Sequence, residues 1–159
     1  MHILLSMRTT MSPPDQAKAV EVAACTCFNL RKATRAVTQL YDDILRPSGL
    51  RATQFNLLSV IWIMETVSIT RLAEEAVIDR TTLARNLDLL KSQGLVRIQA
   101  GEDARVREVS LTQAGHDSVM AAFPRWKKAQ ALVTKTLGPG RVDRLLADLS
   151  AAVAAAQKQ

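Results

Sequence analysis

Aromatic residues are scarce in this chain: they make up 4% of its 159 residues, and only one of them is a tyrosine. Proteins that bind single-stranded nucleic acid stack bases on aromatic side chains, so this scarcity argues against that class. The strands of all-β folds favour aromatic and β-branched residues, so it also argues against an all-β protein. The composition therefore favours a helical fold.

Cysteine and histidine are equally few. Two cysteines, Cys25 and Cys27, and two histidines are too few for a disulfide framework or a Cys/His zinc site. We find no glycine-rich phosphate loop and no paired carboxylates, so we predict no metal, no cofactor and no enzymatic activity. No apolar run approaches the roughly 18 residues of a membrane span or the core of a signal peptide. We therefore expect a cytoplasmic protein that does not contact a membrane.

The chain carries a basic surplus, with a formal net charge of +6 and a pI of about 9.8. Such a surplus favours polyanionic partners such as nucleic acid. From residue 71 to residue 115, however, seven basic residues are balanced by seven acidic ones. A DNA-binding surface in this segment would therefore have to separate its charges by face.

The first half of the chain has a helical period. Residues 1–17 show no periodicity and are predicted to form a flexible tail. Apolar residues then recur at spacings of three and four, which predicts one long helix over residues 18–46, ended by Pro47. Thr53, Thr70 and Asp79 can each cap a further helix, and Gly94 suits the left-handed position after a helix end.

The period then changes to two. Residues 95–99 and 107–111 alternate as strands do, and the polar linker between them predicts a β-hairpin. Thr112 can cap a helix that runs to about Leu137 and that Pro124 should kink. After a Gly-Pro-Gly break, the last helix carries an apolar stripe spaced for a helix–helix seam: Val142, Leu145, Leu146, Leu149 and Val153.

These elements predict a mainly α fold with a small β-hairpin. Residues 47–112 read as a winged helix-turn-helix module, flanked by long helices over residues 18–46 and 113–159 within one protomer, residues 18–159. The module is too small to bury the stripes of both flanking segments, so we expect a two-fold homodimer held by these dimerisation helices. Such a dimer presents two recognition helices roughly 34–36 Å apart, one turn of DNA.

The helix after Asp79 is the expected recognition helix. Leu83, Leu87 and Leu90 would face the core, and the opposite face carries the candidate DNA contacts Arg80, Thr81, Thr82, Arg85 and Asn86. Arginine can bond guanine and asparagine can bond adenine in the major groove. At the hairpin tip, Arg105 can enter a narrow minor groove, with Asp103 holding its guanidinium extended. The alternative is an ordinary solvated helix face.

Over about residues 20–155 the chain resembles the MarR family. Residues 79–85 are similar to the start of that family's recognition helix, residues 91–96 to its end, and residues 103–105, 109–112 and 115 to its wing signature. The resemblance implies a transcription regulator, a repressor that binds palindromic double-stranded DNA as a homodimer and contacts it through Thr82 and Arg85. It further implies release by a small aromatic ligand, in a pocket for which Arg31, Phe55 and Trp62 are the candidate residues. For Phe55 and Trp62, plain core packing is the alternative.

A narrower resemblance concerns the first helix. Cys27-Phe28, followed by Ala33, Arg35, Thr38 and Tyr41, is similar to the MarR-type organic hydroperoxide regulators. It implies that Cys27 senses an oxidant, assisted by Tyr41. Cys27 is otherwise a small core residue or part of a ligand-pocket wall. A different class of function also remains open, a winged-helix dimerisation or interaction module that does not bind DNA and does not need Arg105.

Overall fold

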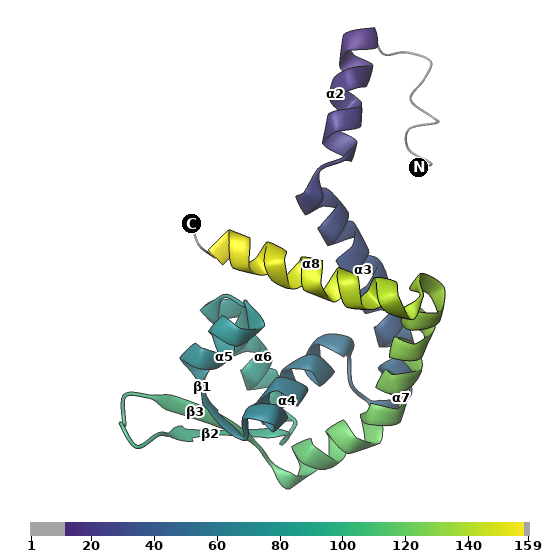
Figure 1. The fold of residues 1–159 in the computed structure, drawn as a ribbon. Helices are drawn as coiled ribbons and strands as arrows, with labels where there is room; N and C mark the ends of the chain where they lie inside the picture. The colour runs from purple at the N-terminus through teal and green to yellow at the C-terminus, as the bar shows by residue number, and fades with distance from the viewer. Residues whose placement is uncertain (1–11, 158–159) are drawn as a thin grey trace. The chain divides into compact units, whose positions relative to one another are not determined.

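The computed structural model describes residues 12–157 and is mainly α-helical with a small antiparallel sheet, which confirms the predicted fold class (Figure 1). The chain divides into two compact units, Met1–Leu40 and Tyr41–Gln159. In the described part of the chain, no helix has both the length and the apolar character that crossing a bilayer requires.

The N-terminal unit contains α2 (Pro13–Ala23) and most of α3 (Thr26–Leu45). The predicted tail over residues 1–17 is wrong in its last part, because α2 already begins at Pro13; residues 1–11 lie outside the described residues. The predicted single helix over residues 18–46 is also wrong, because α2 and α3 are separate helices. Helix α2 begins early because the Ser12 hydroxyl accepts the Asp15 N–H and proline suits the first helical turn. The break at Ala24–Cys25 arises because the side-chain amide of Asn29 donates to the carbonyl oxygens of Ala23 and Cys25, each at 2.9 Å.

The second unit holds the winged helix. A short 3₁₀ turn, η1 (Arg46–Ser48), leads to α4 (Ala52–Met64), β1 (Thr66–Ser68), α5 (Ile69–Ala76), α6 (Arg80–Ser92), β2 (Val96–Ala100) and β3 (Arg107–Leu111). The predicted hairpin is β2–β3, and β1 adds a third strand in the order β1-β3-β2. Two predicted caps are wrong: α4 is preceded by Arg51 rather than capped by Thr53, and α5 is capped by Ser68 rather than Thr70.

The core surrounds α4, whose apolar residues point in nearly every direction. Its Leu58 and Ile61 are fully buried and belong to one core cluster with Leu72 of α5 and Val109 of β3. Leu83, Leu87 and Leu90 of α6 complete the cluster, as the sequence predicted. This packing holds α6 against the module with its other side free.

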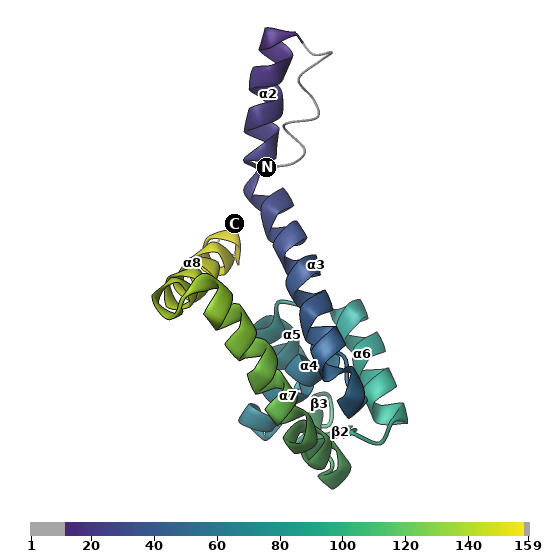
Figure 2. The same cartoon turned by 90° about the vertical axis from the view of Figure 1, so that its right-hand side faces the viewer.

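Helix α7 (Gln113–Leu137) is capped by Thr112, as predicted, and runs through Pro124. It ends at Gly138, whose φ is +88°, and α8 (Pro139–Gln157) leaves it at a sharp turn (Figure 2). Val142 is buried, but the rest of the predicted α8 stripe is exposed in the single chain: Leu145 43%, Leu146 54%, Leu149 37% and Val153 42%.

Candidate nucleic-acid interface

The start of α6 is built by Asp79. Its extended backbone (φ −63°, ψ 148°) precedes the helix, and its Oδ1 accepts the Thr82 N–H at 2.9 Å. The side-chain and backbone hydrogen bonds with Thr82 lower the pKa of Asp79 below its ordinary value. The carboxylate therefore stays ionised at neutral pH and fixes the first turn of the helix.

The faces of α6 are sharply divided. Leu83, Leu87 and Leu90 are at most 1% exposed. At about 100° per residue, the line directly opposite them passes through four exposed residues, Thr81, Arg85, Asp88 and Ser92, which we call the α6 stripe. Two of the predicted DNA contacts, Thr81 and Arg85, lie on this stripe.

The other predicted α6 contacts flank the stripe. Arg80 and Thr82 are exposed in the first turn, whereas Asn86 is half-buried and lies nearer the core side. Sequence reasoning missed Asp88 and Ser92 because it considered only the start of the helix. The helical repeat of the buried leucines was the signal that could have found them.

The wing tip is shaped by Asp103 in an unexpected way. Its Oδ1 accepts the backbone N–H of Arg105 at 2.9 Å, and its backbone carbonyl accepts the N–H of Val106 at 2.8 Å. The sequence predicted a contact with the Arg105 guanidinium instead. A local turn within two residues orders less chain than pinning a long arginine side chain does, so the backbone contact wins. Arg105 itself is exposed.

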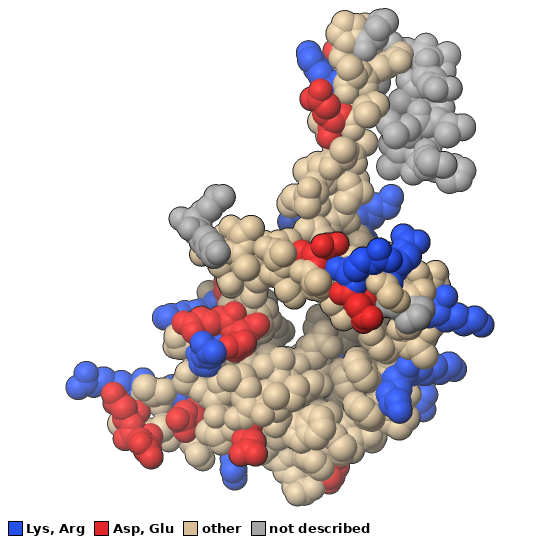
Figure 3. Space-filling view, viewed as in Figure 1, with Lys and Arg blue, Asp and Glu red and all other residues tan. Residues whose placement is uncertain are grey.

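The wing carries charges of both signs, whereas exposed basic residues are concentrated on α7 and the start of α8. The end of the hairpin carries both acidic and basic side chains, as Figure 3 shows. At the base of the wing, Arg97 Nε donates to Ser110 Oγ at 2.9 Å. The exposed basic surplus lies over α7 and the start of α8, on Arg125, Lys127, Lys128, Lys135, Arg141 and Arg144.

The two cysteines lie in the N-terminal unit. Cys25 lies in the break between α2 and α3, Cys27 is the second residue of α3, and both are exposed. Exposure in the single chain does not fit the core alternative for Cys27. Arg31, also exposed, follows it by one turn. Tyr41 lies 14 residues further on, about four helical turns, so the two side chains do not meet along α3.

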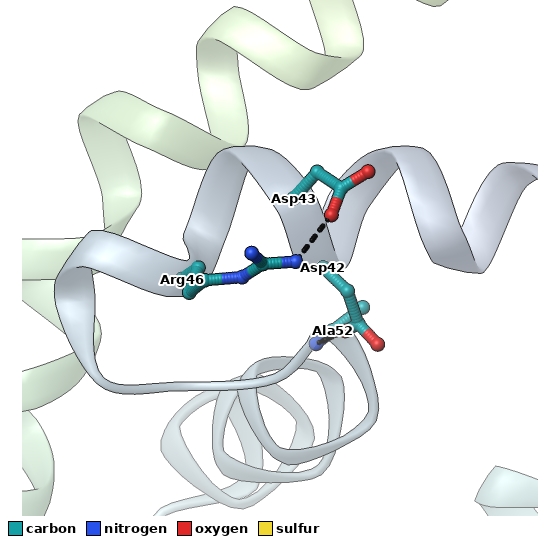
Figure 4. A network of polar contacts seen from close by, with 4 residues as sticks. All are labelled: Asp42, Asp43, Arg46 and Ala52. Atoms are coloured by element: carbon teal, nitrogen blue, oxygen red, sulfur yellow. Dashed lines mark hydrogen bonds and ion pairs between the residues drawn. The ribbon is translucent and has the colours of Figure 1, made fainter.

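Tyr41 instead joins α3 to α7. Its hydroxyl donates to Gln130 Oε1 at 2.6 Å, and burial raises the pKa of this tyrosine, so it remains a donor. The next residue, Asp42, accepts the N–H of Ala52 at 2.6 Å (Figure 4). A carboxylate from α3 thus satisfies the first free N–H of α4.

Two of the candidate ligand-pocket residues, Phe55 and Trp62, do not lie in the same site. Phe55 is 4% exposed, and its ring stacks on Trp126 at 6.1 Å, which confirms the core alternative for Phe55. Trp62 is 41% exposed and lies edge-on to His116 at 6.3 Å. It lines a groove of about 420 Å³ together with Glu65, Arg97 and His116, and Phe55 is not among the residues of that groove.

A second hollow, of about 500 Å³, runs along α7. It is lined by Trp126, Lys127, Gln130, Ala131, Thr134 and Lys135. We call it the α7 hollow. Sequence reasoning missed it because tryptophan and lysine at helical spacing read equally well as an ordinary solvated face.

The chain is similar in sequence to known proteins. A family model described as the MarR family matches residues 48–105. The organic hydroperoxide resistance transcriptional regulator of Bacillus subtilis is 31% identical over 90 residues, covering 56% of this chain and 61% of that protein. The regulator SarZ of Staphylococcus epidermidis is 29% identical over 92 residues, covering 57% and 62%. The chain thus spans about six tenths of the length of these curated relatives.

Solved structures match over a longer stretch. The transcriptional regulator MosR of M. tuberculosis, solved in complex with DNA, is 42% identical, with a TM-score of 0.73 over 83% of this chain and 98% of that one. A MarR variant from E. coli, complexed with operator DNA, is 24% identical with a TM-score of 0.71, covering 77% and 89%. At that identity the second likeness concerns the fold alone.

Proposed function

The chain belongs to the MarR family of DNA-binding transcription regulators, and from this premise we propose that it represses transcription by binding palindromic operator DNA as a homodimer. The observation that carries the proposal is the α6 stripe, which points Arg85 directly away from the core of the winged helix. A regulator of this kind has no catalytic role and acts in the cytoplasm, where bacterial DNA lies.

Each predicted contact takes a role that fits its position. Arg85, at the centre of the stripe, bonds guanine, and Thr81 reaches an adjacent base. At the flanks, Arg80 and Thr82 contact phosphates, and Asn86 reaches an adenine only at the edge of the groove. Arg105, exposed at the wing tip, enters the minor groove, where the negative potential is strongest.

DNA binding is tested by selection from a pool of randomised duplexes. The wild-type protein should enrich a palindrome whose half-sites are about one DNA turn apart. Arg85→Ala should relax the selected sequence, whereas Arg105→Ala should weaken binding and flatten its salt dependence. Enrichment of no sequence would favour the alternative of a dimerisation module that does not bind DNA.

The homodimer is supported by the exposed stripe of α8. Leu145 and Leu149 lie on one side of that helix, and a charge placed in an apolar seam is strongly unfavourable. The double variant Leu145→Asp/Leu149→Asp should be monomeric by light scattering. Ala151→Asp, on the opposite side of α8, is the matched control and should remain dimeric. A dimeric double variant would refute the proposed interface.

Release by a small aromatic carboxylate is supported by the α7 hollow. Gln130 uses its Oε1 to accept from Tyr41, so the amide offers the hollow its N–H donors. Lys127 and Lys135 are also donors, and Trp126 provides an aromatic wall. A surface of donors beside an aromatic ring suits a planar anion.

The ligand proposal is tested with benzoate and 2-hydroxybenzoate. Trp62→Phe leaves Trp126 as the only tryptophan, so its fluorescence reports on the α7 hollow. Adding the acids should quench this fluorescence and lower the affinity for the selected DNA. Lys127→Ala/Lys135→Ala should abolish both effects, whereas Arg31→Ala should leave them. If Arg31→Ala abolishes both effects and Lys127→Ala/Lys135→Ala does not, the ligand binds at Arg31 rather than in the α7 hollow.

An oxidant is the second candidate signal, because Cys27 is exposed at the start of α3 and one relative is named for organic hydroperoxide resistance. The Cys27 sulfur would attack the peroxide bond and become a sulfenic acid as an alcohol leaves. Organic hydroperoxide should release the DNA from wild type and from Cys25→Ser but not from Cys27→Ser. Equal release from all three would rule out Cys27.

A further inference from the structure

The α6 stripe continues past the residues that MarR-type contacts account for. Asp88 lies one turn beyond Arg85 on the same line and is exposed. Seven residues separate it from Thr81, a rise of about 10 Å, which corresponds to about three base-pair steps. A helix that lays Thr81 and Arg85 into the major groove therefore carries Asp88 along the same groove.

A carboxylate is an unexpected side chain on a surface that faces phosphates. Aspartate is among the weaker helix formers, and DNA phosphates repel its charge. Ion pairing is the ordinary explanation, since Arg85 and Lys91 lie three residues to either side. Within residues 12–157, however, the Asp88 side chain forms no ion pair or hydrogen bond. No contact within the described residues therefore engages this carboxylate.

We propose that Asp88 is a specificity-determining residue that selects a G·C pair in each half-site. This inference rests on the proposed function. The Asp88 carboxylate accepts a hydrogen bond from the 4-amino group of cytosine, the base edge that acidic side chains recognise. Guanine O6/N7 and thymine O4 are acceptors and leave the carboxylate unpaired, and adenine places its N7 acceptor beside its 6-amino group, where it repels a carboxylate. At non-cognate sites the same charge is repelled by phosphates, so Asp88 also suppresses nonspecific binding.

The test compares selections from the randomised duplex pool by wild type, Asp88→Asn and Asp88→Ala. Asp143→Asn, an exposed acid on α8, is the control with the same change in net charge. The wild type should select one cytosine per half-site, and replacing it should weaken binding by about tenfold. In Asp88→Ala this preference should fall to about twofold, and affinity for a shuffled duplex should rise. Asp88→Asn should accept adenine at that position, because asparagine pairs with adenine.

Three results would overturn the inference. If both Asp88 variants select the wild-type sequence with undiminished preference, Asp88 does not read a base. If they bind every duplex more tightly by the same factor, the carboxylate only repels phosphate. If the wild type selects no sequence at all, the proposed function fails and the inference falls with it, a result distinct from the first two. Circular dichroism and light scattering establish that the variants are folded dimers before they are compared.

Discussion

Replacing Gly115 by alanine tests the junction between the wing and α7. A Cβ atom at this glycine would lie 1.9 Å from the carbonyl oxygen of Leu95. An acceptable carbon–oxygen approach is about 3.3 Å, so the two backbones would have to separate by about 1.4 Å. They are held together because Leu95 O accepts the Thr112 N–H at 3.1 Å and the Thr112 hydroxyl donates to Gly94 O at 2.6 Å. The substitution must therefore strain the packing or break this contact.

The magnitude follows from these contacts. Overpacking costs about 1–3 kcal/mol and loss of the backbone hydrogen bond about 0.5–1.5 kcal/mol, offset by about 1 kcal/mol because alanine favours a helix. We expect Gly115→Ala to lower the free energy of unfolding by about 2 kcal/mol and the Tm by about 4–8 °C. Urea unfolding followed by circular dichroism measures the free energy, and a thermal scan measures the Tm, for both the variant and its control.

Gly140→Ala is the matched control for that experiment. Gly140 also lies in the first turn of a helix, but a Cβ there meets nothing within 4 Å. Its stability should be unchanged or higher by up to about 1 kcal/mol. If Gly115→Ala is as stable as Gly140→Ala, the close approach to Leu95 does not constrain the wing and the reasoning is refuted.

Three further changes concern helix ends. Val77 has a left-handed backbone (φ +51°, ψ +46°), which strains a β-branched residue by about 1–2 kcal/mol. Val77→Gly should therefore raise the urea concentration at the midpoint of unfolding, and a lower midpoint would contradict this. Asp42→Ala removes the acceptor for the Ala52 N–H and should cost about 1–2 kcal/mol in urea unfolding, and more than Asp42→Asn, which keeps an acceptor. The hydrogen bonds from Thr82 hold the pKa of Asp79 below its ordinary value, so its stabilisation is present above that ordinary value and is lost as the pH falls through the lowered pKa. The stability difference between wild type and Asp79→Ser should therefore shrink below about pH 4, and a constant difference would show that the charge is unimportant.

Local features of the chain were predictable from the sequence. Asp79 and Thr112 cap the helices that follow them, Gly94 is left-handed with φ +71°, and the alternating residues form the β2–β3 hairpin. Each of these outcomes depends on residues within a few positions of one another, where backbone and side-chain chemistry decide the conformation. The buried leucines of α6 belong to this group, and with them the direction in which Arg85 points.

Other features depended on contacts between distant residues. The start of α4 follows from Asp42, ten residues earlier, and β1 exists only because three residues with no periodicity pair with β3. Phe55 and Trp62 lie two turns apart on one helix, yet Trp126 of α7 covers the first and leaves the second exposed.

The candidate sites divide in the same way. The α6 stripe repeats within one helix, so the leucine repeat in the sequence could have located all four of its residues, although sequence reasoning named only Thr81 and Arg85. The α7 hollow was not, because the side of Gln130 that can donate depends on Tyr41, 89 residues away in the chain. Spacing within a helix predicts which residues share a face. Only the packed fold decides what that face contacts, because burial and hydrogen-bond partners are set by segments that the local sequence does not contain.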